Sequence, residues 1–152
     1  MSAVALLGAL ALARPAAAQP LAVMIASSSD ASPGGLDARS RTAHGAVVRR
    51  ALRDVLRRAG ADVRLTGNGA RRLDVAVVAW RVTPAATQTE VAVELRVLVA
   101  DEHGRMLSIL TSKAKISAPG SARLAELREQ AIAGAIEGIA PALQAQLARD
   151  VG

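Results

Sequence analysis

Hydrophobic and polar residues follow two helical stretches and several strand-like stretches along this chain. Residues 21–26 form a short continuous apolar run, typical of a buried strand, and the turn-forming residues Ser27 to Asp30 predict that a loop follows. Either Asp37 or Ser40 can cap the next element, which the apolar spacing predicts to be an amphipathic helix ending at Gly60. Its apolar stripe consists of Val47, Val48, Ala51, Leu52, Val55 and Leu56.

The middle of the chain changes to a period of two, which predicts β-strands. After a short strand at residues 62–66, the segment from Leu73 to Pro84 is apolar on both faces, as expected for an interior strand. One of these faces should carry Trp80 together with Ala76, Val78 and Val82, and we expect Trp80 to lie in the core between sheet and helices. Residues 89–99 alternate apolar with charged side chains, and a tight turn at residues 101–104 leads into a partner strand that ends near Ile116.

A second long helix follows Pro119-Gly120, with Ser121 predicted as its cap. Gly134 and Gly138 would let this helix approach a sheet closely, and Pro141 should bend it. Its predicted buried stripe consists of Leu124, Leu127, Ile132, Ile136, Ile139, Leu143 and Leu147.

The element order is strand, helix, strand, three-stranded meander, helix. It predicts an α+β two-layer sandwich in which a mostly antiparallel sheet of four to five strands packs both helices on one face. The other face should be partly polar, with charged side chains at Glu90, Glu94, Arg96, Lys113 and Lys115.

The first eighteen residues read as a secretory signal peptide. An apolar core from Ala3 to Ala13 precedes Pro15 and the small residues of positions 16–18, which match the pattern cut by signal peptidase. We expect cleavage between Ala18 and Gln19, export to the periplasm or medium, and one domain over residues 19–152. The apolar core is too short to span a bilayer, which needs roughly twenty residues.

The composition narrows the possible functions. Apolar residues make up 51% of the chain, but Trp80 is its single aromatic residue and it has no cysteine. Thiol chemistry and Cys-bound metals are therefore excluded, and a lipoprotein-type anchor is not expected. Nucleic acid is a poor match, because its binding sites commonly stack bases on aromatic side chains.

Positive charge is concentrated in one region. Residues 39–72 hold ten arginines against two aspartates, whereas acidic residues outnumber basic ones in the rest of the predicted domain. Arg49, Arg53 and Arg57 follow helical spacing and should align along one side of the first helix, where guanidinium groups suit phosphate or carboxylate partners. A solvated face, with arginine favoured by a GC-rich coding sequence, explains the same pattern.

Residues with catalytic potential are few. A serine hydrolase would have to use one of Ser27 to Ser29, with His44 or His103 as the base and Asp30 or Asp37 as the orienting acid. The chain has no G-x-S-x-G motif. We expect His44 to be exposed or partly packed on the first helix and His103 to face water in a turn. The carboxylates and histidines do not follow metal-ligand spacing, so we expect no metal and no cofactor.

The ordered segments resemble a group of bacterial periplasmic domains. These segments are LAVMIA, GAVVRRALRDVLRRAGADVRL, LDVAVVAWRV and VAVELRVLVADEHGRMLSILTSKAKI, followed by the C-terminal helix. Together they resemble the penicillin-binding-protein activator lipoproteins, the curli-export lipoprotein and the N-terminal domain of the Tol–Pal translocation protein. The resemblance covers nearly all of residues 21–150, has no diagnostic motif and implies a domain that acts by binding partners.

The sequence therefore favours a non-enzymatic exported domain that binds another cell-envelope component, either a protein or an anionic polymer. Arg49, Arg53 and Arg57 are the candidate contact residues. Two alternatives remain open: a small envelope hydrolase using Ser27–Asp30 with His44, and an anion-binding protein using the arginine-rich helix. The oligomeric state is not predicted.

Overall fold

The computed structural model describes residues 19–149. The expected signal peptide and Ala18, on the N-terminal side of its expected cleavage site, therefore lie outside the described residues. Seven elements follow one another in the predicted order. They are β1 (Ala22–Asp30), α1 (Ala38–Arg58), β2 (Asp62–Arg64), β3 (Arg71–Pro84), β4 (Gln88–Asp101), β5 (Met106–Pro119) and α2 (Leu124–Arg149).

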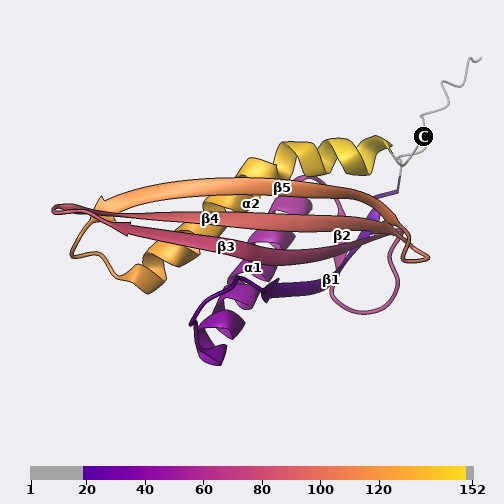
Figure 1. The fold of residues 1–152 in the computed structure, drawn as a ribbon. Coiled ribbons are helices and arrows are strands. Elements are labelled where there is room, and N and C mark those ends of the chain that lie inside the picture. Colours follow the sequence, from indigo (N-terminus) through magenta and orange to yellow (C-terminus); the bar gives the residue numbers. More distant parts are fainter. Residues whose placement is uncertain (1–18, 150–152) are drawn as a thin grey trace, which may run out of the picture.

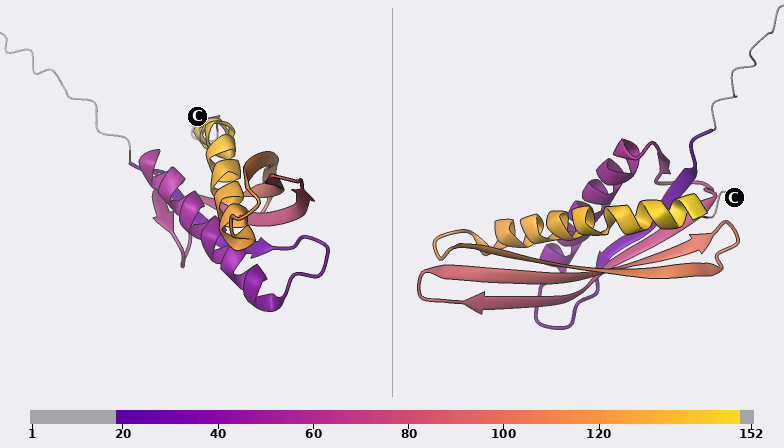
Figure 2. Two further views of the ribbon diagram at one scale, coloured as in Figure 1. Left: turned by 90° about the vertical axis from the view of Figure 1, so that its left-hand side faces the viewer. Right: turned by 90° about the horizontal axis from the view of Figure 1, so that it is seen from above.

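The five strands form one sheet in the order β2-β1-β3-β4-β5. The short β2 and the central β3 both pair with β1 in parallel, whereas β3, β4 and β5 form the antiparallel meander. Figure 1 looks onto the face that the helices leave uncovered, and Figure 2 shows α1 and α2 together on the opposite side. The predicted α+β two-layer sandwich is confirmed, with a mixed, mostly antiparallel sheet.

The core lies between the helices and the sheet and is built from aliphatic side chains. The alternate residues of β4 are all buried, as the period of two predicts: Val91, Val93, Leu95, Val97 and Val99. The predicted stripe of α1 is buried except for Ala51, which is half-buried. In α2 the predicted stripe is buried from Leu127 onward, but Leu124 at the first position of the helix is 37% exposed.

Residues Ser27 to Asp30 do not form the predicted loop, because they continue β1 alongside β3. A register irregularity between Ile25 and Ser27 resets the alternation of side chains. Ser28 and Asp30 pair with Val75 and Val77, whose side chains are buried under the helices. The polar end of β1 is therefore part of the sheet, and half of its side chains face α1.

Trp80 packs against the core between the sheet and the helices, as predicted, but a second irregularity, in β3 between Val77 and Ala79, changes which residues share its face. The uninterrupted period of two places Trp80 with Ala76. In the structure Ala76 lies opposite exposed Arg96, whereas Trp80 lies opposite buried Val93. The extra residue turns Trp80 toward the helices, where it is half-buried and packs against the core.

The start of α2 also differs from the prediction. Ser121 does not cap the helix, because the backbone turns first, with the Ala122 amide donating to the Pro119 carbonyl, and the helix begins at Leu124. Pro141 lies inside α2 without ending it, and Figure 1 shows that this helix changes direction along its length.

A glycine is required where α1 crosses the sheet but not where α2 does. A Cβ atom on Gly45 of α1 would lie 2.8 Å from the backbone oxygen of Ser28 in β1. In α2, the added Cβ of Gly134 would lie 3.7 Å from the Ala114 Cβ of β5, which is an ordinary contact. The Ser112 hydroxyl also donates to the Ala135 carbonyl at 2.7 Å and thereby ties β5 to α2.

This difference in spacing predicts opposite effects for the same substitution. Gly45→Ala should destabilise the protein by about 1–3 kcal/mol, because a methyl group pushed against backbone cannot be relieved by a rotamer change. Gly134→Ala should be neutral or stabilise by up to about 1 kcal/mol, because alanine favours the helix and its methyl group fits. Urea unfolding of the two variants measures this difference, and equal effects would contradict the close crossing of α1 over β1.

Candidate functional site

The most connected polar group in the described part of the chain is the carboxylate of Asp30, at the end of β1. His44 of α1 donates from Nδ1 to Oδ2 over 2.7 Å, and Trp80 of β3 donates from Nε1 to the same oxygen over 3.0 Å. The backbone amide and hydroxyl of Ser32 both donate to Oδ1. Arg41 donates to the Asp30 carbonyl over 3.0 Å and lies 3.6 Å from Oδ1. The carboxylate therefore connects β1, α1, β3 and the loop before α1.

The electrostatics of this cluster favour the charged carboxylate. Burial raises the pKa of Asp30, but the hydrogen bonds from Ser32, Trp80 and His44 outweigh burial and hold that pKa below its ordinary value. Since the ionised carboxylate accepts only, the Nδ1 atom of His44 must carry the proton that it shares with Asp30.

The rings of His44 and Trp80 continue the cluster toward α2. Their centroids are 5.2 Å apart with the planes tilted by 51°, and the Arg128 guanidinium lies 5.8 Å from the Trp80 ring centre. His44 is 4% exposed, so the expectation of an exposed or partly packed side chain is wrong. The sequence did contain a signal, because His44 precedes Val47 and Val48 by three and four residues and so extends the apolar stripe of α1.

Two of the three serines proposed for a hydrolase form hydrogen bonds away from His44, and the third, Ser29, is exposed on β1. Ser27 donates to Asp74 over 2.6 Å, and Ser28 accepts from Arg49 Nε over 3.2 Å. Ser32, which the sequence analysis did not single out, donates to Asp30 rather than to His44. Within residues 19–149, no serine hydroxyl forms a hydrogen bond with His44, so the Asp30–His44 pair lacks the nucleophile of a triad.

The three candidate arginines of α1 occupy different environments. Arg49 and Arg53 are half-buried, and Arg53 Nε is buried without a hydrogen-bond partner, 3.6 Å from Asp54 Oδ1. Arg57 is exposed. On the side of α1 that faces α2, Arg58 pairs with Glu137. The helix thus does not present its arginines as one uniform stripe.

Among the described residues, no group of three or more histidine or acidic side chains could hold a metal ion. None of the helices in that part of the chain combines the length and apolar character needed to cross a bilayer.

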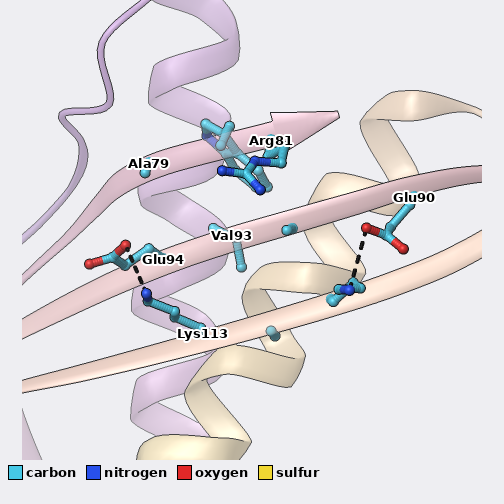
Figure 3. Close-up of a pocket in the computed structure, with 10 residues that line it drawn as sticks. Ala79, Arg81, Glu90, Val93, Glu94 and Lys113 are labelled. Atoms are coloured by element: carbon cyan, nitrogen blue, oxygen red, sulfur yellow. Dashed lines mark ion pairs between the residues drawn. The ribbon is translucent and has the colours of Figure 1, made fainter. Parts of the chain in front are cut away.

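The uncovered face of the sheet carries a shallow hollow of about 370 Å³ over β3, β4 and β5. Figure 3 shows ion pairs on either side of it, Lys113 with Glu94 at 3.8 Å and Lys115 with Glu90 at 3.5 Å. Arg81 lines the hollow from β3, is exposed and makes no hydrogen bond or ion pair within the described residues. The predicted polar face is thereby confirmed, and Arg81 is a member that the sequence analysis missed.

The Asp30 cluster predicts a large stability effect from a small chemical change. Asp30→Asn should destabilise the protein by about 2–4 kcal/mol, because the amide replaces an acceptor by a donor and leaves buried donors without partners. Asp54→Asn is the matched control, since the Asp54 side chain is 57% exposed. Chemical denaturation followed by Trp80 fluorescence measures both, and similar small effects would contradict the structural role of Asp30.

The lowered pKa of Asp30 also predicts an acid dependence. Below the ordinary aspartate pKa, here 3.8, the unfolded chain binds a proton that the folded chain still excludes, so stability falls as the pH drops through the folded pKa. The stability difference between the protein and Asp30→Asn should therefore be greatest above pH 4 and shrink below it. Asp37 and Asp101, whose pKa values are also lowered, are common to both proteins and cancel in this difference. A gap that stays constant down to pH 2 would contradict the assignment.

Comparison with known proteins identifies the fold. No family model and no curated protein matches the sequence. A putative lipoprotein from Caulobacter crescentus is similar in structure, with a TM-score of 0.55, 17% identity and coverage of 78% of this chain and 90% of that one. A minor lipoprotein from Acinetobacter baumannii has a TM-score of 0.52, 12% identity and coverage of 82% and 90%. A hypothetical protein from Chlamydia trachomatis has a TM-score of 0.53, 10% identity and coverage of 86% and 98%. The chain therefore shares a fold found in bacterial lipoproteins.

Proposed function

We propose that this protein is a non-enzymatic, exported domain that binds another component of the bacterial cell envelope through the uncovered face of its sheet. The observation that carries the proposal is the arrangement of polar groups. The polar groups of the buried cluster around Asp30 are engaged in contacts within the fold. The uncovered face presents charged side chains, among them Arg81, which has no ion-pair partner in residues 19–149.

The geometry around His44 supports a binding role over the hydrolase alternative. General-base catalysis needs a nucleophile within hydrogen-bond reach of the imidazole. The Ser27 and Ser28 hydroxyls are engaged with Asp74 and Arg49, and Ser32 is engaged with Asp30. His44 and Asp30 instead join α1 to β1, which is a structural use of the same chemistry.

The expected location and partners rest on the shared fold and on the sequence. The similar structures include lipoproteins, which supports an envelope location, and the signal-like residues 1–18 support the periplasm or medium. We include in this proposal the finer resemblance to three kinds of partner-binding envelope protein. These are the penicillin-binding-protein activators, the curli-export lipoprotein and the Tol–Pal translocation protein. The partner is then an envelope protein or an anionic envelope polymer.

The arginine-rich helix remains the competing surface. Arg57 is exposed and available, but Arg49 already binds Ser28, so the three arginines would not act as equivalent contacts. A test must therefore sample both surfaces separately.

Site-specific photocrosslinking in intact native cells provides this test. A photoreactive amino acid at Thr111, exposed on the uncovered face of β5, should give a discrete product of higher mass whose second component is an envelope molecule. The matched position is Arg57, exposed on the outer side of α1. A product from Arg57 alone would move the contact to the helix, and no discrete product from either position would contradict the binding role.

A further inference from the structure

The hollow on the uncovered face has a specific charge pattern. Arg81 of β3 lies directly opposite Ala92 of β4, and Ala92 lies directly opposite Lys115 of β5. One row across the sheet therefore places the methyl group of Ala92 between two cationic side chains, Arg81 and Lys115. Adjacent strands are about 4.8 Å apart, so the two cations stand on strands roughly 10 Å apart with a small side chain between them.

Small side chains keep this space open. Ala79 and Ala92 line the hollow and occupy positions where a longer residue would fill it. Its volume of about 370 Å³ is at the lower end of small-molecule sites. A ligand group seated above Ala92 would thus lie between two positive charges.

The charges around the hollow leave one cation uncompensated. Lys113 and Lys115 form ion pairs with Glu94 and Glu90, and the Nζ atoms lie 3.8 and 3.5 Å from the carboxylate oxygens. Both lysine side chains are exposed to solvent. Such pairs are weak, so a ligand can compete for either lysine. Arg81 has no partner in the described chain, and its planar fork of donors matches a carboxylate or phosphate group.

We propose that this hollow binds a carboxylate group of the envelope partner, held by Arg81 and Lys115 above Ala92. Carboxylate is favoured over phosphate because Glu90 and Glu94 flank the row, and a phosphate monoester carries nearly twice the negative charge near neutral pH. The inference rests on the proposed binding function and names the chemistry of its ligand.

Titration of the purified protein with triglutamate, a carboxylate probe, tests the inference. At low salt, the amide resonances of Ala79 and Ala92 should shift on addition of triglutamate, with weaker or no response to inorganic phosphate. Arg81→Gln should weaken triglutamate binding about tenfold, since it removes a charge-assisted hydrogen bond. Ala92→Leu should abolish binding without changing any charge, because the larger side chain occupies the hollow.

The matched control is Arg50→Gln. Arg50 is an exposed arginine on α1 with no ion pair in the described residues, so its loss changes the net charge as Arg81→Gln does. Equal weakening by both substitutions would show diffuse attraction and overturn the site, as would tighter binding of phosphate or no binding of triglutamate. If a crosslinked partner is found but triglutamate does not bind, carboxylate binding in the hollow is contradicted and the proposed function stands. If triglutamate binds but no cellular partner is found, the proposed function is contradicted and carboxylate binding in the hollow stands.

Discussion

The buried carboxylate of Asp30 is the interaction on which the arrangement of this fold depends. A charge removed from water is costly unless it is hydrogen-bonded, and Asp30 is only 7% exposed. Its partners come from a helix, a neighbouring strand and a loop, so the requirement to satisfy one side chain fixes the positions of three segments. Aliphatic side chains supply most of the buried surface, but they specify relative positions less sharply than a set of directed hydrogen bonds.

The same end of β1 also determines how closely α1 approaches the sheet. Gly45 lies next to His44, and the backbone of Ser28 occupies the space that a side chain would need. A larger residue at position 45 would lift the helix away from the strand and lengthen the contact between His44 and Asp30. The glycine and the histidine therefore form one structural unit: the first allows the approach and the second makes it specific.

The division of polar groups between the two faces of the sheet is the basis of the proposed binding role. On the helix side, the buried carboxylate of Asp30 is satisfied by hydrogen bonds from within the fold. On the uncovered side, exposed ion pairs surround a hollow floored by alanines, and Arg81 has no partner among residues 19–149. Weak surface pairs cost little to exchange for contacts with a ligand, which is the behaviour expected of a recognition surface.

The sequence by itself determined the element order, the helix-facing residues of β4 and the fold class, because these depend on local periodicity and on burial of apolar side chains. The expected close approach of α2 through Gly134 and Gly138 was not found, because an added Cβ atom there makes ordinary contacts. Tertiary structure alone decided which residues share a face with Trp80 and the strand character of Ser27–Asp30, since both depend on register irregularities in pairing with a neighbouring strand. The sequence brought Asp30 and His44 together only as candidate members of a hydrolase site. Their direct contact and the row from Arg81 to Lys115 required the fold, because each joins residues that are far apart in the chain.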